Sequence, residues 1–308
     1  MKTALCIPSY GHRHTELLEH MNKYTGDKYD MFVFIQDNDV NNKLYYDDNF
    51  ENVRVIQTGA RALCENRQQI VNFCMDSGYK KIIMCDDDMG DTVGMIDESC
   101  KRATSDSYKK KTVDIFELFD KMVSVADEYD AGLVGVPHDV YLGFMKPGKV
   151  TINSGCSVCG IVLIDLDKTF RLYPELHYTT PETNISEDID IALQMRQNNV
   201  KFAKICDYGY NTYKAFGKSV CFEDSRARDI NVFNTAKKWR LQLKTDRDFH
   251  LQLKARWNLY ENHTMPEPKN DLEKKLFKMY DDNVPFEEVY EYVKSLNKKF
   301  KKKEETNP

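Results

Sequence analysis

Three consecutive aspartates, Asp86, Asp87 and Asp88, are the residues whose type and spacing most directly indicate chemistry. They follow the apolar run at residues 81–85 without a break, which places them at the end of a predicted buried strand. Adjacent carboxylates repel one another, and Mn²⁺ or Mg²⁺, which prefers carboxylate oxygen and shares its coordination with substrate phosphates, relieves that repulsion. Because alternate side chains of an extended segment face the same way, we expect Asp86 and Asp88 to face the metal while Asp87 points elsewhere. The alternative is an acidic turn that lies in solvent.

Glu187 and Asp188 form a second pair of carboxylates, at the start of a helix predicted at residues 187–197. A carboxylate near a metal-bound leaving group can act as the general base for an attacking hydroxyl. The alternative is that these acids only favour the positive end of the helix dipole. Arg67 lies on an earlier predicted helix, and its guanidinium suits bidentate contact with a phosphate or a carboxylate. The alternative for Arg67 is an exposed helix arginine.

An alternation of strands and helices must position these residues. Apolar runs predict strands at residues 3–7, 31–35, 53–56, 81–85, 133–137, 156–164 and 201–206. Helical spacing predicts helices at residues 14–24, 62–77, 113–129 and 187–197. The polar stretch at residues 90–111 is predicted to be a loop with some helix. This order predicts an α/β fold whose mostly parallel sheet is flanked by helices and binds ligands beyond the carboxyl ends of its strands.

The character of the chain changes after about residue 217. Residues 226–257 hold nine Lys and Arg against three Asp, with Trp239, Phe249 and Trp257 interleaved. Cations of this segment would meet DNA phosphates, and an aromatic side chain such as Trp239 or Trp257 could stack on a base. The alternative is an amphipathic helical pair with a solvated basic face.

The composition and the patterning predict three parts. They are a catalytic domain at residues 1–217, a helical, basic and aromatic C-terminal extension at residues 218–300, and a disordered tail at residues 301–308. Two helices are predicted in the later extension, at residues 271–280 and 286–300.

The chain has 308 residues, of which 41% are hydrophobic, and a formal net charge of −5. No stretch approaches the roughly 20 apolar residues of a membrane span. Residues 1–8 lack the features of a signal peptide, so we expect a cytoplasmic protein with no membrane partner. The nine cysteines lack the spacing of a disulfide framework and are expected to be reduced and mostly buried, with a structural role for Cys156 and Cys159.

Several stretches of the sequence occur together in one order. They are Ile7-Pro8-Ser9-Tyr10, Gln36-Asp37, Gly59 with Glu65-Asn66-Arg67, Ile82-Ile83-Met84-Cys85-Asp86-Asp87-Asp88, and Ser186-Glu187-Asp188 with Leu193 and Arg196. This ordered set, over roughly residues 3–210, resembles the GT-A-fold glycosyltransferases near the family 2-like enzymes. The resemblance implies a GT-A-like, Rossmann-like sheet and a UDP-sugar or other nucleotide sugar as donor.

The resemblance also implies a role for each matching residue. The nucleotide-sugar pocket would be formed by Pro8, Ser9, Tyr10, Arg13, Asp37, Arg67, Asp86 and Asp87. Asp86 would approach the ribose or the metal, and Asp88 would hold Mn²⁺ or Mg²⁺ on the diphosphate. Asp188 would be the general base, with Glu187 beside it. The sugar would move in a single displacement that inverts the anomeric centre, with the metal stabilising the departing diphosphate.

A narrower resemblance lies in Pro8-Ser9-Tyr10-Gly11-His12-Arg13, in Gln36-Asp37 and in Asp86-Asp87-Asp88-Met89. These stretches look like the phage-type glycosyltransferases associated with TET/JBP enzymes. That family implies 5-hydroxymethyl pyrimidine in DNA as the acceptor, and the host cytoplasm as the location. On this chain the DNA would be held by Lys237, Lys238, Trp239 and Arg240.

The sequence departs from these patterns in two places. Arg13-His14 stands where the narrower family often has Arg-Pro. Family 2-like enzymes often supply a late histidine to the metal, and residues 207–216 contain none. Either Asp207 replaces that histidine or the metal keeps more water.

Two other kinds of function stay open. The acceptor could be a glycan or a protein rather than DNA. The chain could also be a metal-dependent nucleotidyltransferase or a DNA-binding module without transfer activity. Nucleotidyltransferases usually carry a Gly-rich loop with Lys or Arg after the first strand, whereas residues 8–14 have one glycine and no lysine. A binding module would not need Asp86 and Asp88.

Overall fold

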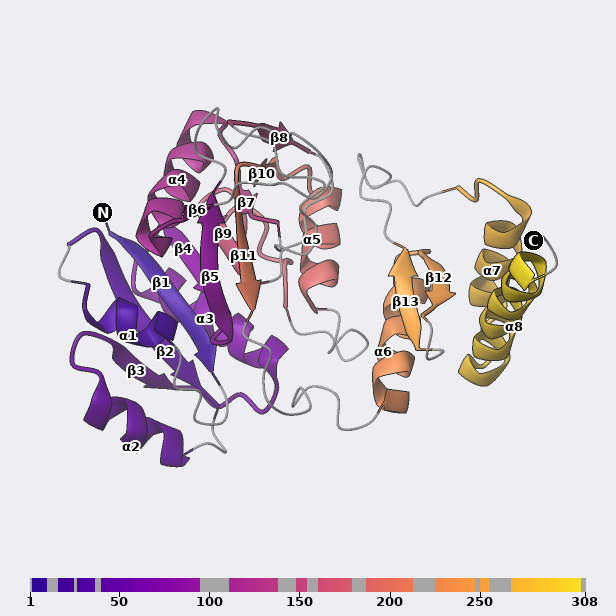
Figure 1. Ribbon diagram of the computed structural model, residues 1–308, viewed down its shortest axis with the longest axis horizontal. Coiled ribbons are helices and arrows are strands. Elements are labelled where there is room, and N and C mark those ends of the chain that lie inside the picture. Colours follow the sequence, from indigo (N-terminus) through magenta and orange to yellow (C-terminus); the bar gives the residue numbers. More distant parts are fainter. Residues whose placement is uncertain are drawn as a thin grey trace.

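The computed structural model of the chain, drawn in Figure 1, describes most of the sequence. The described residues are 2–9, 16–24, 27–36, 40–94, 111–137, 148–153, 160–178, 187–212, 225–246, 250–254 and 267–305. The candidate site residues Tyr10, Arg13 and Asp37 and the pair Cys156 and Cys159 lie outside these ranges.

An eight-stranded sheet forms the centre of the molecule, with the strand order β3-β2-β1-β4-β9-β7-β10-β8. Its strands are β1 (Thr3–Ser9), β2 (Tyr29–Ile35), β3 (Arg54–Gln57), β4 (Lys81–Cys85), β7 (Leu133–Gly135), β8 (Val150–Ile152), β9 (Ile161–Asp165) and β10 (Phe202–Ile205). All of them run in one direction except β8 and β9, which are antiparallel to their neighbours. The predicted α/β class, with a mostly parallel sheet flanked by helices, is confirmed.

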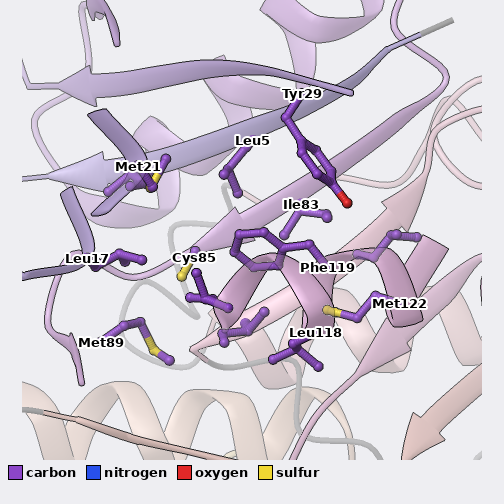
Figure 2. Packing of buried hydrophobic residues seen from close by; sticks show 14 of the residues in the cluster. Leu5, Leu17, Met21, Tyr29, Ile83, Cys85, Met89, Leu118, Phe119 and Met122 are labelled. Atoms are coloured by element: carbon purple, nitrogen blue, oxygen red, sulfur yellow. The ribbon is translucent and has the colours of Figure 1, made fainter. Parts of the chain in front are cut away.

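Helices cover both faces of this sheet because successive strand residues point to opposite faces. The helices are α1 (Glu16–Asn22), α2 (Val40–Asn49), α3 (Leu63–Asp76), α4 (Ile115–Glu128) and α5 (Glu187–Gln197). In β1, Leu5 and Ile7 join the buried cluster that contains α1 and α4 residues, and Figure 2 shows Leu5 with the α4 side chain Phe119. Ala4 and Cys6 join the opposite cluster, which contains residues of α3 and α5.

A second sheet of three strands, ordered β11-β5-β6, begins directly after the three aspartates. Its strands are β5 (Met89–Gly94), β6 (Lys111–Thr112) and β11 (Tyr208–Thr212). The sequence predicted a loop with some helix over residues 90–111, but residues 90–94 and 111 are strand. Residues of β11 pair with β5 from far along the chain, and a local pattern cannot reveal such a partner.

The C-terminal unit, defined here as the described part of residues 225–305, holds three helices and a β-hairpin. Its elements are α6 (Ser225–Lys238), β12 (Gln242–Thr245), β13 (Leu251–Lys254), α7 (Asp271–Asp281) and α8 (Phe286–Glu305). The hairpin was not part of the predicted helical extension, and it forms because Leu241, Leu243 and Leu251 bury one side of it. The last helix runs past residue 300 to Glu305, into the segment predicted to be disordered, because its Lys and Glu residues favour helix.

The C-terminal unit has a buried cluster of its own, which also includes Leu193 of α5. Figure 1 shows the unit on the side of the molecule that carries α5. The helix α5 therefore has neighbours on two sides, the central sheet on one and the C-terminal unit on the other.

Two sequence-based expectations concern the class of protein. Within the described ranges, no helix is long and apolar enough to span a membrane. Five described cysteines are buried free thiols, which confirms the prediction of reduced, buried residues for Cys6, Cys64, Cys74, Cys85 and Cys206.

Candidate active site

The ends of the neighbouring strands β1 and β4 are joined through Ser9 and Asp87. The Ser9 hydroxyl donates a hydrogen bond to Asp87 Oδ2 at 2.8 Å, and it lies 2.6 Å from the Tyr46 hydroxyl. Since the Ser9 proton goes to the carboxylate, Tyr46 is the donor in the second bond. All three side chains are buried. Asp87 thus faces the inside of the domain, as the alternation of side chains predicted, and Ser9 and Asp87 fix the aspartate triplet to β1.

The backbone at Asp86 is held from the other side by the start of β9. The Asp86 N–H donates to the Gly160 carbonyl at 2.9 Å. Gly160 has a φ of +76°, and a Cβ added there would lie 2.1 Å from the hydroxyl oxygen of Tyr210 on β11. Only glycine adopts this conformation at such close approach without strain. The aspartates therefore leave β4 at a junction between the two sheets.

Arg67 on α3 joins the two groups of acids that the sequence singled out. Its Nη2 lies 2.8 Å from Asp86 Oδ1, and its Nη1 lies 2.8 Å from Glu187 Oε1. The Arg67 side chain is 7% exposed, so it is not the exposed helix arginine of the alternative interpretation. Burial alone would lower the pKa of Arg67, but the charges of Asp86 and Glu187 raise it above its ordinary value.

The residues on either side of Arg67 are buried and polar as well, and sequence reasoning missed their roles. Asn66 donates to the Phe34 carbonyl at the end of β2, at 3.0 Å. Gln68 accepts from the Tyr178 N–H at 2.9 Å. Their burial explains these contacts, because buried polar groups need fixed partners, but burial cannot be seen in the local sequence.

Glu187 and Asp188 occupy the first turn of α5, and their environments differ. Glu187 is buried against Arg67; burial raises its pKa to about 7, although the Arg67 charge opposes this and Asp188 adds to it. Asp188 is half-buried. Burial also raises the pKa of Asp188, and the charge of Arg67 offsets this only in part. Carboxyl groups with raised pKa values beside other acids are characteristic of sites that exchange protons.

Asp86 and Asp88 fit a divalent cation. The Asp86 side chain is 31% exposed and Asp88 is half-buried, so both can reach a ligand from solvent. Mg²⁺ is commonly bound through one or two protein carboxylates, with water and substrate phosphates completing its coordination. In the part of the chain that the structure describes, no group of three or more His, Cys, Asp and Glu side chains is placed so that it could hold a metal ion.

Asp207 does not fit the place of the missing histidine ligand. The strand register sets Tyr208 opposite Gly94 and Thr212 opposite Met89. Asp207 therefore lies beyond the Gly94 end of β5, roughly 20 Å along the strand from Asp88. Of the two possibilities that the sequence left open, the strand register argues against Asp207 as a metal ligand.

The candidate DNA-binding residues of the C-terminal unit all have partners within the protein. Trp239 is 3% exposed, and its indole N–H donates to Asp190 Oδ1 at 2.6 Å. The Lys238 ammonium lies 2.8 Å from the same oxygen. A base could stack on Trp239 only after this contact opened, so the structure does not present the ring as the sequence interpretation expected.

Lys237 and Arg240 have partners nearer the surface. Lys237 donates to Asn283 Oδ1 at 2.7 Å, and Arg240 pairs with Asp281 at 2.6 Å. Both partners belong to the C-terminal unit itself. A phosphate contact by Arg240 would compete with its ion pair, whereas Lys237 has a neutral amide as partner.

Comparison with known proteins identifies a family for most of the chain. A model of the family described as TET-Associated Glycosyltransferase matches residues 3–219. No curated protein sequence matches the chain.

Similar folds occur among solved structures at low sequence identity. Residues 1–349 of S. aureus TarS give a TM-score of 0.45 at 13% identity, with 77% of this chain and 66% of that chain covered. The mannosyltransferase PcManGT from Pyrobaculum calidifontis, solved with GDP-Man and Mn²⁺, gives 0.44 at 11% identity, with 76% and 62% covered. A putative nucleotide-diphospho-sugar transferase from Desulfovibrio desulfuricans gives 0.42 at 10% identity, with 75% and 97% covered. The chain thus spans less than two thirds of the length of the first two.

Proposed function

This chain belongs to the TET-associated glycosyltransferase family, and from that membership we propose that it transfers a sugar from a nucleotide-diphosphate sugar to a hydroxyl acceptor. The reaction proposed is a metal-dependent single displacement that inverts the anomeric centre. The favoured acceptor is 5-hydroxymethyl pyrimidine in DNA.

The observation that carries this proposal is the position of Arg67 between Asp86 and Glu187. A donor held at Asp86 and a base beside Glu187 would lie on the two sides of one guanidinium. An in-line displacement needs the base and the leaving group in one fixed arrangement, and a rigid forked cation provides it. Arg67 is therefore assigned a positioning role, in place of a direct contact with the diphosphate.

Asp188 is the proposed general base, and Glu187 supports it. The carboxylate of Glu187 is engaged by Arg67, whereas Asp188 is half-buried on the same turn. In the proposed step Asp188 accepts the proton of the acceptor hydroxyl while that oxygen attacks the anomeric carbon. The bond from this carbon to the diphosphate oxygen breaks with its electron pair remaining on the diphosphate. The raised pKa of Asp188 makes it a stronger base than an ordinary aspartate.

Asp86 and Asp88 would hold the divalent cation on the donor. When bound there, Mn²⁺ or Mg²⁺ would neutralise the charge that develops on the departing diphosphate. Asp87 contributes by fixing the backbone between these two ligands through its bond to Ser9. The nucleotide would lie over the ends of β1 and β2, where Pro8 and Ser9 are described and Tyr10, Arg13 and Asp37 belong to undescribed segments.

Two observations support DNA as the acceptor: membership of a family named for its association with TET enzymes, and the excess of cations in residues 226–257. Lys237 on α6 and the exposed Lys244 on β12 are the cations best placed to meet phosphates. Lys238 and Arg240 would share or exchange an ion-pair partner on contacting DNA, and Trp239 would have to leave Asp190.

A panel of nucleotide sugars tests the function. The purified chain is incubated with each donor and with hydroxymethylated duplex, unmodified duplex, an oligosaccharide or a peptide, with and without EDTA. We expect a mass increase of one sugar on the hydroxymethylated duplex, lost in EDTA and restored by Mn²⁺, with inverted stereochemistry by NMR. Transfer to the oligosaccharide or the peptide alone would select the other acceptor class. Absence of transfer and of donor hydrolysis with every donor would contradict the proposed activity.

A further inference from the structure

Asp190, at the end of the first turn of α5, is a buried carboxylate that the proposed reaction does not use. It is fully buried, and three donors surround it. Oδ1 accepts from Trp239 Nε1 at 2.6 Å and lies 2.8 Å from Lys238 Nζ, and Oδ2 accepts from Gln194 Nε2 at 2.7 Å. Two of these donors belong to the C-terminal unit, outside the family-matched residues 3–219.

The position of Asp190 on the helix relates it to the candidate base. Glu187 and Asp190 are three residues apart and therefore lie on neighbouring positions of one helix face, with Asp188 on the turn between them. On its other sides α5 packs through Ile191 against the central sheet and through Leu193 against the C-terminal unit. Apolar packing allows a helix to slide or rotate slightly, whereas a buried charge with directional partners fixes its rotation.

The same contacts continue to the helix that carries Arg67. The Gln194 side-chain amide donates to the His177 carbonyl at 2.8 Å, and its carbonyl accepts from the His177 N–H at 2.9 Å. The next residue, Tyr178, donates its N–H to Gln68, the neighbour of Arg67. A chain of hydrogen bonds therefore runs from the C-terminal unit through Asp190 to both helices that form the site.

We propose that Asp190 is a positioning residue for sugar transfer, and that Trp239 and Lys238 of the C-terminal unit hold it so that Asp188 points at the acceptor. This role rests on the function proposed above, because it assumes that the reaction is sugar transfer. It predicts that the C-terminal unit sets turnover through the orientation of α5 and leaves donor affinity unchanged.

The test uses the full-length chain with paired substitutions. Trp239→Phe with Lys238→Met removes the two donors that the C-terminal unit provides to Asp190, and it keeps an apolar side chain at each position. Lys238→Arg is the conservative variant that restores a charged donor. Asp281→Asn is the matched control, because it breaks the ion pair to Arg240 inside the same unit.

Two measurements are made on each variant. Hydrogen exchange of the amides in residues 187–197 needs no substrate, and we expect faster exchange in the double variant only. Kinetics with a working donor and acceptor should show kcat reduced by roughly 10- to 100-fold, as expected for a displaced catalytic group, with the KM for donor unchanged. Lys238→Arg in the presence of Trp239→Phe should recover part of kcat.

Each outcome decides the proposal. Unchanged exchange in α5, or faster exchange with unchanged kcat, would overturn the positioning role. Equal effects on kcat and on donor KM would show general loss of structure and also overturn it. If the double variant does not fold, Lys238→Met alone is measured against Asp281→Asn with the same expectations. A wild-type chain that transfers no sugar would contradict the proposed function, while the exchange experiment would still report on the contact.

Discussion

The first turn of α5 buries two carboxylates three residues apart, Glu187 and Asp190, and their surroundings differ. Glu187 shares the single guanidinium of Arg67 with Asp86, and Asp188 adds another negative group. Asp190, in contrast, receives three donors. They are Trp239, Lys238 and Gln194.

The difference is one of charge balance. A buried ion with all its partners is a fixed structural element, and removing one partner leaves an uncompensated charge. Around Glu187 and Asp188 there is more negative than positive charge. Burial raises the pKa of Glu187 to about 7 and raises that of Asp188 as well, and the charge of Arg67 offsets this only in part. Such a place attracts a proton or a cation. We infer that chemistry occurs at the Glu187–Asp188 pair and that Asp190 holds the helix in place.

Replacing the proposed general base should have the largest effect on turnover. We expect Asp188→Asn to lower turnover by ~10²–10⁴-fold, because the amide cannot accept the proton of the acceptor hydroxyl. Affinity for the nucleotide diphosphate, measured by calorimetry, should stay nearly unchanged. Asp271→Asn is the matched control, since Asp271 is a fully exposed acid in the first turn of α7. Unchanged turnover in Asp188→Asn would assign the base to another group.

Removing the metal ligand should have the next largest effect. Asp88→Asn should reduce transfer by roughly 10²–10³-fold, because charge on the departing diphosphate loses its stabilisation. EDTA should act in the same way, with recovery on adding Mn²⁺. Asp91→Asn, an exposed aspartate on the following strand, should leave the rate unchanged. Full activity in EDTA would contradict the assignment of Asp86 and Asp88 as metal ligands.

The sequence predicted the strand and the helix that carry the candidate active site more completely than the side-chain contacts between them. The apolar run at residues 81–85 and the helix at residues 187–197 could be located because periodicity is a local property. The contact of Arg67 with Glu187 joins residues 120 positions apart, which periodicity alone does not reveal. The ordered set of motifs placed Arg67 and Glu187 in one site, and its assignment of Arg67 to the donor pocket remains a prediction.

In the C-terminal unit, the sequence indicated the residue types but not their contacts. Its cations and aromatic residues were recognised, and their partners were not. Trp239 and Lys238 could belong to a surface or to an interface with α5, and the composition is the same in both cases. Asp190 was part of an acidic helix start in the sequence, and nothing local distinguishes a solvated acid from a buried one. The β12–β13 hairpin was missed because its strands are only four residues each.

The pH dependence of protein stability tests whether the pKa of the buried Glu187 is raised. The pKa of Glu187 is raised by burial to about 7, so the folded protein binds its proton more tightly than the unfolded chain does. The sign follows from linkage: Glu187 contributes stability at low pH, and this contribution is lost as pH rises from about 4.5 through 7. Glu187→Gln should therefore flatten the fall of unfolding free energy over that range, measured by urea unfolding at several pH values. Glu288→Gln, at an exposed position of α8, should retain the wild-type slope, and a wild-type slope in Glu187→Gln would contradict this interpretation.

The smallest expected effect concerns DNA, and it tests whether the C-terminal unit does more than hold α5. Reversing Lys237 and Lys244 to Glu should weaken transfer to hydroxymethylated duplex and leave donor hydrolysis unchanged. These two lysines are chosen because neither contacts Asp190, so the positioning contact is preserved. If each meets a phosphate, the slope of log affinity against log salt should flatten by ~0.9 per lost contact.

The matched control reverses Lys2 and Lys80, which changes the net charge of the protein by the same amount. Both are exposed and lie where β1 and β4 begin, at the opposite ends of these strands from the aspartates. A general electrostatic effect of net charge would alter both double variants equally, whereas a bound duplex would respond to Lys237 and Lys244 alone. Equal salt slopes in all three proteins would leave α6 and β12 with a solvated basic face. The C-terminal unit would then act on the reaction only through Asp190, and the DNA acceptor would rest on family membership without support from these residues.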